Sequence, residues 1–445
     1  MNRRRFLIQT GRAATGTLLL PSFLQACKKS EWQHENPFSG DVIIIGAGIA
    51  GLYAAEILIK QGVNVQVLEA GTSWGGRLHA LPEGSELIRA AERKKIHGQF
   101  SILFDLLKDQ QINLIPQTGS ELYYFNGMLN TEEQAYQNTF FIDMLAAVEG
   151  LKSIEPADIT AQAYFDSLEL SDNVAPVFDV LTAQVYGTSA DRISAAGIAR
   201  QHALWNSGNT VYEIETVRLE QAMEKSFAKA IEKTQLATAV SSIDFTSDKV
   251  LITDSTGNTY SCDRVLVTIP LDALQRGAIE FNPPINSSKQ QAIDRIGIDS
   301  SYCSMFKLAS APWPIGTRRI IGSGLVHSFE VTNDGWVFAE VSGTQTLEIE
   351  SITTNPLEFI INEFYQLYPT TQGQVSEASI QYWPGNRSYD GPGISNAREL
   401  LAQPMNGKLF FAGEATHKGG HHGTLHGAME TAFRAVTEIL SSAKA

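Results

Sequence analysis

Three glycines near the start of the chain stand where a dinucleotide-binding turn needs them. Gly46, Gly48 and Gly51 follow the apolar run 42–45, which reads as a buried parallel strand. The first glycine permits a tight turn, the second lets backbone N–H groups approach a pyrophosphate, and the third lets the next helix pack on the sheet. The spacing therefore predicts a strand, a phosphate-binding turn and a helix over 49–60.

An acid and a cation follow at the spacing that such a site uses. The second strand is expected over 63–68, and Glu69 ends it 23 residues after Gly46, where its carboxylate can accept hydrogen bonds from ribose hydroxyls. Downstream, Gly76 allows close backbone approach and Arg77 supplies a cation for the pyrophosphate. Together these residues predict a nucleotide site.

A second segment, far along the chain, completes the pattern. Residues 409–416 read as a strand that ends in Gly413 and Glu414, and an amphipathic helix is expected to run to about residue 441. With Glu69, the glycine pair Gly75-Gly76 and Arg77, this ending resembles the flavin amine oxidase superfamily, which includes monoamine, polyamine and L-amino-acid oxidases. The resemblance implies bound FAD.

The resemblance also implies which residues contact FAD. Glu414 would hydrogen-bond its ribityl or pyrophosphate region, although a glutamate beside a helix start can also act as a cap. Thr424 and Leu425 would lie against the flavin ring, and Val240 belongs to the segment that holds the adenine side. No cysteine stands near 391–393, where monoamine oxidases bond the flavin covalently, so noncovalent FAD is expected. The expected cofactor-binding residues are Gly46, Gly48, Gly51, Glu69, Gly76, Arg77, Val240, Gly413, Glu414, Thr424 and Leu425.

The predicted fold class is α/β, with a Rossmann-like, discontinuous FAD-binding domain and an α+β substrate-binding domain. The chain has 445 residues, 43% of them hydrophobic, and is long enough for two or three domains. Helical periodicity dominates 99–108 and 219–233, and mixed strands are expected over 302–381. The expected boundaries are 1–27 for a signal peptide, 28–40 for a linker, 41–115, 210–285 and 386–445 for the FAD-binding domain, and 116–209 and 286–385 for the substrate domain.

Composition restricts the partners. The chain carries 48 acidic and 34 basic residues, a formal charge of −14, which disfavours nucleic acid as a partner. An acidic surface mildly favours cationic small molecules, although solvation explains it as well. Cys262 and Cys303 are expected to be free buried thiols in apolar strands.

The substrate side departs from the family pattern. The family places a lysine, hydrogen-bonded through water to the reactive nitrogen of the flavin, ten residues before a tryptophan. Counting back from Trp313 gives Cys303. Lys307 is a poor replacement, because four residues of strand span roughly 13 Å. Cys303 reads either as a reactive thiol or as a small core residue.

Other residues are candidates for contact with the substrate. His97 lies in an Ile-His-Gly tripeptide that resembles one near the flavin of polyamine oxidases, and Trp383 resembles their tryptophan before the closing segment. Arg93 resembles the carboxylate-binding arginine of L-amino-acid oxidases, but the run 93–95 reads equally as a solvated charge run. The candidate catalytic residues are Cys303, Arg93, His97, Trp383 and His426.

A histidine cluster near the C-terminus raises the question of a metal. It stands on a glycine-rich loop and a helix start, and the sequence shows no acidic or cysteine partner for it. A polar rim of the active site is therefore favoured over a metal site, and no metal is expected. The cluster consists of His417, His421, His422 and His426.

The N-terminus resembles an export signal. Residues 3–7 resemble the twin-arginine motif, and the apolar stretch 13–26 is too short for a comfortable membrane span. Residues 24–27 resemble a bacterial lipobox, with Cys27 lipidated after cleavage, and an uncleaved basic tail is the alternative. The expected location is periplasmic or membrane-anchored, as an exported bacterial lipoprotein.

The sequence therefore predicts an FAD-dependent oxidoreductase that converts an amine or L-amino acid into the imine. Dioxygen is the expected electron acceptor, giving hydrogen peroxide, unless Cys303 diverts the electrons to another acceptor. Two alternatives stay open: a related FAD-dependent desaturase or dehydrogenase, and a lipid-anchored flavoprotein without oxidase turnover.

Overall fold

The computed structural model describes residues 38–78, 95–153, 157–214, 218–322 and 324–442. The expected export signal, Cys27 and Arg93 lie outside these residues and stay predictions. Among the described residues, no helix is both long and apolar enough to cross a membrane.

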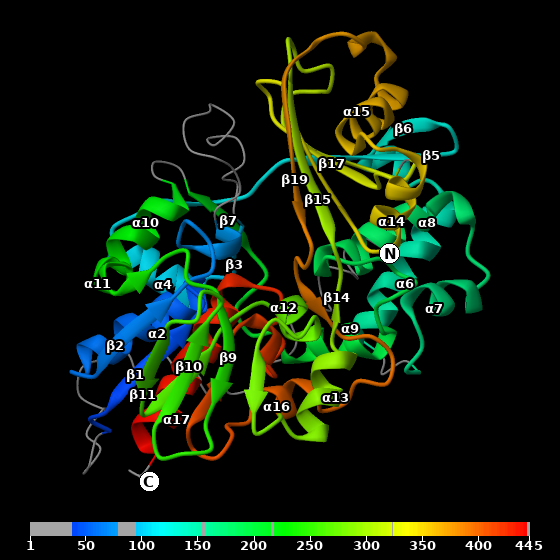
Figure 1. Ribbon diagram of the computed structural model, residues 1–445. Coiled ribbons are helices and arrows are strands. Elements are labelled where there is room, and N and C mark those ends of the chain that lie inside the picture. The colour runs from blue at the N-terminus through cyan, green and yellow to red at the C-terminus, as the bar shows by residue number, and fades with distance from the viewer. Residues whose placement is uncertain (1–37, 79–94, 154–156, 215–217, 323, 443–445) are drawn as a thin grey trace. The chain divides into compact units, whose positions relative to one another are not determined.

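A five-stranded parallel sheet carries the glycine turn (Figure 1). Its central strand places Val42 opposite Val65 on one neighbour and Arg264 on the other. The apolar run 42–45 is buried, as a central parallel strand requires. In sheet order the strands are β21 (Leu409–Phe411), β12 (Arg264–Val267), β1 (Asp41–Ile45), β2 (Asn64–Leu68) and β8 (Thr234–Gln235).

Helices from opposite ends of the described chain pack together beside this sheet. Helix α2 (Ile49–Lys60) has the predicted bounds. Helix α17 (Leu425–Ser441) is the predicted amphipathic helix, and it packs against α2. The glycine turn and the C-terminal segment therefore lie at one place, as a shared site requires.

A smaller sheet contains Val240 at the start of a strand. In this sheet β10 pairs antiparallel with both β11 and β9, and β13 pairs with β9 in parallel. Cys262 is buried at the end of β11, as expected for a free core thiol. In sheet order the strands are β11 (Thr259–Cys262), β10 (Val250–Asp254), β9 (Val240–Asp244) and β13 (Glu280–Asn282).

A seven-stranded sheet forms the second large layer (Figure 1). The strands expected over 302–381 are present, and two helices that were not expected, α14 (Thr344–Ile352) and α15 (Pro356–Leu367), lie between the last two of them. Asn355 caps α15, and Ile360 and Phe364 pack on the sheet at helical spacing. In sheet order the strands are β19 (Val375–Trp383), β15 (Ser301–Leu308), β18 (Trp336–Ser342), β17 (Ser328–Val331), β16 (Thr317–Ile321), β5 (Ser120–Phe125) and β6 (Met128–Thr131).

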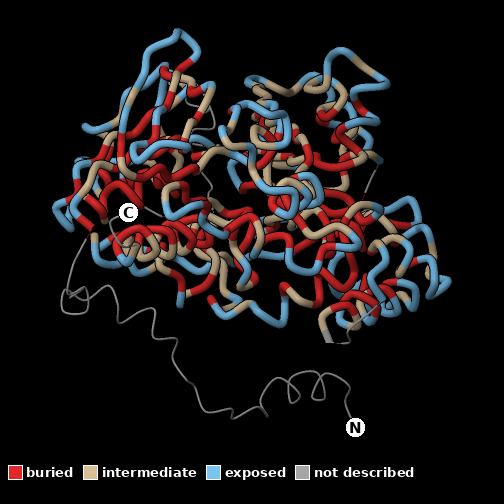
Figure 2. Tube along the Cα trace, turned by 60° about the horizontal axis from the view of Figure 1, so that its bottom comes forward, coloured by how far each residue is buried: buried red, intermediate tan, exposed pale blue. Residues whose placement is uncertain are grey.

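Helices fill the space beside the second sheet around a core that contains Phe141, Phe165 and Phe178. The tube in Figure 2 shows that buried segments run through the interior, while most exposed segments are loops and helix surfaces. The helices of this layer are α5 (Glu132–Ala135), α6 (Thr139–Ser153), α7 (Ala161–Ser167), α8 (Ala175–Thr182) and α9 (Ala195–Leu204).

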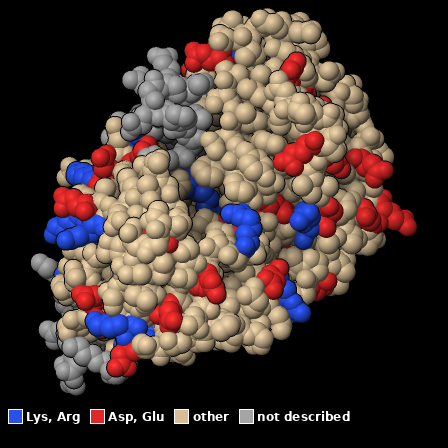
Figure 3. Space-filling model, in the orientation of Figure 1, with Lys and Arg blue, Asp and Glu red and all other residues tan. Residues whose placement is uncertain are grey.

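The remaining elements include a three-stranded sheet that carries His97. The helix predicted over 219–233 is divided at Phe227 into α10 and α11. On the face shown in Figure 3, charged side chains of both signs are interspersed. The bounds are β3 (Ile96–His97), β7 (Val211–Ile214), β4 (Leu114–Pro116), α4 (Ile102–Asp109), α10 (Leu219–Ser226), α11 (Ala228–Glu232), α12 (Leu271–Gln275), α13 (Ser287–Arg295), β14 (Gly297–Ile298), β20 (Ser388–Tyr389) and α16 (Ala397–Ala402). The predicted domain boundaries stay a prediction.

A buried lysine joins two of these helices. Nζ of Lys289, on α13, donates hydrogen bonds of 2.8, 2.7 and 2.7 Å to the carbonyls of Leu400, Leu401 and Gln403. These carbonyls belong to the end of α16, where backbone acceptors have no partner within the helix. Nζ also lies 4.1 Å from the centre of the Phe411 ring, at the end of β21, and burial lowers the pKa of Lys289 to about 7.

Replacing this lysine with Met keeps much of its volume and removes all three donors. Lys289→Met is expected to lower the free energy of unfolding by about 3 kcal/mol, since three buried carbonyls lose their partner. Urea denaturation followed by circular dichroism measures the change. Lys229→Met, at an exposed position on α11, is the control and is expected to stay within about 0.5 kcal/mol of the original chain. A Lys289→Met chain as stable as the control would contradict the expectation.

Candidate active site

The glycine turn has the geometry that its sequence predicts. Gly46 has φ +105°, a left-handed conformation that favours glycine. A Cβ at Gly51 would overlap the carbonyl oxygen of Gly46, so the turn and helix approach each other more closely than a side chain permits. A Cβ at Gly48 would meet no atom within 4 Å, which leaves the backbone open to a ligand at the start of α2.

Glu69 orders this turn from the end of β2. Its carboxylate accepts hydrogen bonds from the backbone N–H groups of Ala47 (2.6 Å) and Gly71 (2.8 Å). Each oxygen carries one of these bonds and keeps a further lone pair, so the group can still accept from ribose hydroxyls. The N–H of Thr238 donates to the carbonyl of Glu69 at 2.7 Å, which places the segment before Val240 beside the same strand end.

Glu414 lies at the carboxyl end of β21 with only 5% of its surface exposed. It follows Gly413, whose φ is +126° and whose Cβ position is open. Its carboxylate accepts hydrogen bonds from Ser388 Oγ (2.6 Å) and the N–H of Gly423 (2.8 Å), and it lies 3.3 Å from Nη1 of Arg77. Although burial alone raises the pKa of a carboxyl, Arg77, Ser388 and Gly423 hold the pKa of Glu414 below its ordinary value.

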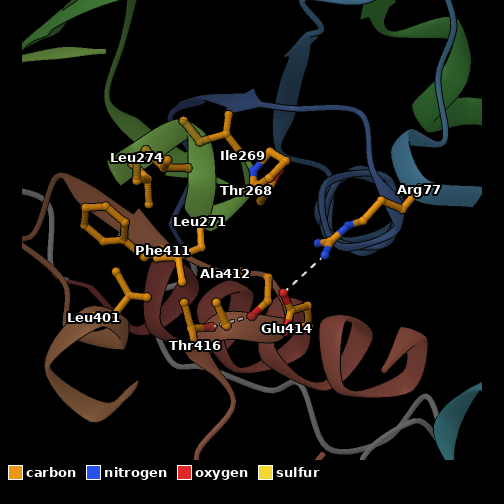
Figure 4. Close-up of a pocket in the computed structure, with 14 residues that line it drawn as sticks. Arg77, Thr268, Ile269, Leu271, Leu274, Leu401, Phe411, Ala412, Glu414 and Thr416 are labelled. Atoms are coloured by element: carbon orange, nitrogen blue, oxygen red, sulfur yellow. Dashed lines mark hydrogen bonds and ion pairs between the residues drawn. The ribbon is translucent and has the colours of Figure 1, made fainter. Parts of the chain in front are cut away.

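A pocket of about 360 Å³, including space open to solvent, lies beside this pair (Figure 4). Its walls come from 267–271 after β12 and from 411–416 after β21, and Leu274 and Leu401 add apolar surface. In Figure 4, Arg77 reaches toward Glu414 at the edge of the pocket. Ligands of open parallel sheets bind outside the carboxyl ends of the strands, where these walls lie.

The residues at this edge fit a flavin dinucleotide. The open backbone at Gly48 and Gly413 suits close approach of phosphate and ribityl groups. Arg77 offers a cation, and Glu69 and Glu414 offer carboxylates that hydroxyls can donate to. Thr424 caps α17 by accepting from the N–H of Gly427 at 3.0 Å, so the predicted ring contacts at 424 and 425 start a helix.

The position of the family lysine is polar rather than apolar. The expectation that Cys303 is a buried thiol is wrong: it is half-buried on β15, and its cross-strand neighbours are Glu340 and Gln381. Glu340 forms an ion pair with Arg387 and accepts a hydrogen bond from Asn386 at 3.0 Å. No spacing in the sequence marks this pair, because its members lie on separate strands and loops.

His97 is half-buried at the end of β3. Burial and the nearby charges of Lys95 and Arg387 lower the pKa of His97 to about 4, so the imidazole is neutral at pH 7. The ring of Trp205 lies 6.1 Å from it, edge to face. Trp383 lies at the end of β19, opposite Ser301. Sequence reasoning missed Trp205, which carries no family signal and follows α9.

The histidine cluster has an acidic partner, contrary to expectation. Oε2 of Glu430 lies 2.7 Å from Nε2 of His417 and 2.7 Å from Nδ1 of His421. Glu430 is on α17, nine residues after His421, where helical spacing brings it back over the loop. The potential ligand atoms of these three residues lie within 4.8 Å of one another. His426 is buried beside them, with 1% of its surface exposed.

Comparison with known proteins defines the class. Residues 216–440, about half of the chain, match the family model of flavin containing amine oxidoreductases. Residues 44–89 match the NAD(P)-binding Rossmann-like domain. The chain therefore belongs to the flavin containing amine oxidoreductase family, and its class is that of FAD-dependent oxidoreductases of the amine oxidase type.

Individual relatives place the chain within this family. It is 28% identical over 441 residues to lysine-specific histone demethylase 2 of Homo sapiens, covering 85% of this chain and 50% of that protein. It is 24% identical over 449 residues to polyamine oxidase 3 of Oryza sativa subsp. japonica, covering 89% and 88%. The chain thus spans about half the length of the demethylase and most of the polyamine oxidase.

A solved structure shares the fold. Cyclohexylamine oxidase from Brevibacterium oxydans IH-35A has a TM-score of 0.74 to this chain at 19% identity, covering 91% of this chain and 99% of that chain. This likeness and the Rossmann-like match confirm the predicted α/β fold class.

Replacing Glu414 with Gln tests its place at the cofactor edge. Glu414→Gln is expected to weaken FAD binding about tenfold or more, because Arg77 and the N–H of Gly423 lose an ionised partner. Because the pKa of Glu414 is depressed by folding, its contribution to stability is present above its ordinary pKa and is lost as pH falls through the folded pKa. The variant should therefore lose less stability on acidification below about pH 4.

Fluorescence titration of the FAD-free chain measures the affinity, and thermal melts across pH measure the stability. Glu399→Gln, which removes an exposed carboxylate on α16, is the matched control. Equal FAD affinity for the two variants would show that the carboxylate of Glu414 does not contribute to FAD binding.

Proposed function

We propose that this protein uses noncovalently bound FAD to oxidise an amine or an L-amino acid to the imine, with dioxygen as the acceptor. FAD supplies the chemistry by accepting a hydride equivalent from the carbon that bears the nitrogen. The imine then hydrolyses in water to a carbonyl compound and ammonia or an amine. Family membership supports the reaction type, and the names of two relatives, a polyamine oxidase and a cyclohexylamine oxidase, support a small amine.

The observation that carries the proposal is the neutral imidazole of His97, which lies beside the ring of Trp205. An amine reacts as the free base, and a neutral imidazole beside Trp205 does not oppose it with a positive charge. Such an imidazole can also accept a hydrogen bond from a substrate N–H group. The residues proposed to act on the substrate are thus His97 and Trp383, with Arg93 added if the substrate carries a carboxylate.

The residues proposed to hold FAD are those at the strand ends. Backbone N–H groups at the start of α2 would bind the pyrophosphate, and Glu69 would accept hydrogen bonds from the ribose hydroxyls. Glu414 and Arg77 would bind the part of FAD next to the pocket. No covalent attachment is proposed, because the region 391–393 contains no cysteine. Export by the twin-arginine route and lipidation at Cys27 remain part of the proposal.

Anaerobic titration of the purified chain with single amines tests the reaction. Cyclohexylamine, spermine, spermidine and L-amino acids are added separately, and the visible absorbance of oxidised flavin is followed. One class is expected to bleach it, because reduction is the first half of the reaction. Dithionite is the positive control. A chain that dithionite bleaches and no member of this panel bleaches would contradict the proposal.

Cys303 gives a separate prediction about the acceptor. A lysine at this position, opposite Glu340 across the strands, would supply the cation that the family resemblance implies beside the reactive part of the flavin. Cys303→Lys is expected to raise the rate of reoxidation by dioxygen about tenfold or more over the original chain. Stopped-flow absorbance of the reduced protein mixed with oxygenated buffer measures the rate.

Cys303→Ala is the matched control for this change. It removes the thiol without adding charge, so its reoxidation rate should equal that of the original chain. A Cys303→Lys chain that reoxidises no faster than Cys303→Ala would show that charge at this position does not govern the acceptor.

A further inference from the structure

A continuous chain of hydrogen bonds leads from the start of α17 to a partly exposed carboxylate. Nε2 of His426 lies 3.1 Å from Oγ of Ser207, which lies 3.0 Å from Nε2 of His421. Nδ1 of His421 lies 2.7 Å from Oε2 of Glu430, and Nε2 of His417 lies 2.7 Å from the same oxygen. Four groups are thus joined without a gap from His426 to Glu430.

The backbone determines the proton positions at the outer end. The N–H groups of Gly419 and His421 point to Nδ1 of His417, at 3.0 and 3.2 Å, so this nitrogen accepts. The proton of neutral His417 is therefore on Nε2 and is donated to Glu430. An ionised carboxylate only accepts, so Nδ1 of His421 also carries a proton and donates it to Glu430.

The inner half of the chain follows from this arrangement. The N–H of Asn206 points to Nε2 of His421 at 3.5 Å, so this nitrogen accepts, and the hydroxyl of Ser207 is the donor. Oγ of Ser207 then accepts from Nε2 of His426. Every hydrogen bond points toward Glu430, and Nδ1 of His426 is left as the basic atom at the inner end.

Burial and charge keep this arrangement in place. Ser207 and His426 are buried, whereas the side chain of Glu430 is 29% exposed. Burial lowers the pKa of His426 to about 3, so the ring is neutral at pH 7. Although burial raises the pKa of a carboxyl, hydrogen bonds from His417 and His421 lower the pKa of Glu430 to about 2. The chain therefore rests with a neutral imidazole, His426, at its inner end and an ionised carboxylate, Glu430, at its outer end.

The direction of these hydrogen bonds disfavours a metal ion between His417, His421 and Glu430. Metal binding at Nε2 of His417 would move its proton to Nδ1, where two backbone N–H groups already point. Trp205 covers the cluster instead, with its ring centre 5.0 Å from that of His421 and 5.5 Å from that of His426. An apolar cover of this kind excludes water from the buried part of the chain.

We propose that His426, Ser207, His421 and Glu430 form a proton relay between the substrate side and solvent. The proposal rests on the proposed amine oxidation. A substrate ammonium must lose one proton besides the hydride equivalent, and reduction of dioxygen to hydrogen peroxide takes one proton back. The relay serves both half-reactions: it carries a proton out to solvent in the first and carries a proton in from solvent in the second.

Each passage conserves protons. In the outward passage a proton binds Nδ1 of His426, its Nε2 proton moves to Oγ of Ser207, the hydroxyl proton moves to Nε2 of His421, and the Nδ1 proton of His421 moves to Glu430, which releases it to water. The inward passage reverses each transfer and restores the starting tautomers. The two half-reactions together therefore leave the relay unchanged.

Nuclear magnetic resonance tests the resting arrangement without any turnover. In the full chain with bound FAD, labelled with ¹⁵N at histidine, imidazole shifts at pH 7 are expected to show protons on Nε2 of His417, Nδ1 of His421 and Nε2 of His426. Histidine-to-asparagine variants assign the signals. A charged His426, or a proton on Nε2 of His421, would overturn the relay whether or not an amine substrate is found.

Two substitutions test the transfer itself. Ser207→Ala removes the bridge, and Glu430→Gln removes the terminal base with little change of shape. The rate of anaerobic flavin reduction by an active amine is expected to fall about tenfold or more at pH 7. It should recover at about pH 10, where the amine arrives uncharged, and added imidazole should restore part of it at pH 7. The groups whose charge bears on His426 in this range are His421, Glu430, His97 and His417.

Ser301→Ala is the control, because Ser301 is a buried serine whose hydroxyl has no hydrogen-bond partner among the described residues. Its reduction rate should match the original chain at both pH values. A rate loss in Ser207→Ala that is equal at pH 7 and pH 10 would indicate a structural role and overturn the relay, as would no loss at all. If no amine reduces the original chain, the proposed function fails. The histidine tautomers measured by nuclear magnetic resonance still decide whether the hydrogen bonds of the relay run in the proposed direction.

Discussion

A carboxylate buried at 5% exposure stays ionised only if charge and hydrogen bonds surround it, and Glu414 meets this constraint with groups from the whole chain. Arg77 comes from the turn after β2, Ser388 from β20 and the N–H of Gly423 from the loop before α17. Behind Ser388, Arg398 donates to its hydroxyl at 2.8 Å. Removing any of these partners would leave the charge of Glu414 less compensated, so the segments must close together for the cofactor edge to exist.

The substrate side follows the opposite rule, because its histidines are kept neutral rather than charged. Burial lowers the pKa values of His97 and His426, and the only carboxylate of the described cluster, Glu430, sits at its outer end. The imidazoles of His97 and His426 are thus neutral and lie beside the ring of Trp205. This neutrality suits a reaction in which an uncharged amine gives up a hydride equivalent.

Local signals in the sequence predicted the elements around the glycine turn and the C-terminal helix. The strand, turn and helix at 42–60 and the long C-terminal helix lie where the residue spacing predicted them. This agreement is expected, because the conformational needs of glycine and the periodicity of apolar residues are properties of a few neighbouring residues. The Glu340–Arg387 pair, Trp205 and the partnership of Glu430 with two histidines were not predicted. Each depends on contacts between segments that only the folded sheet and α17 bring together, and no spacing records them.

The identity of the bound group is tested most directly by denaturing the purified full chain and separating the released nucleotide from the protein. Chromatography and absorbance then give the amount and kind of nucleotide per chain. One FAD per chain, all of it in the protein-free fraction, is the expected result. A chain that carries no flavin after purification in the presence of FAD, or flavin that stays with the precipitated protein, would contradict the noncovalent FAD site described for Glu69, Arg77 and Glu414.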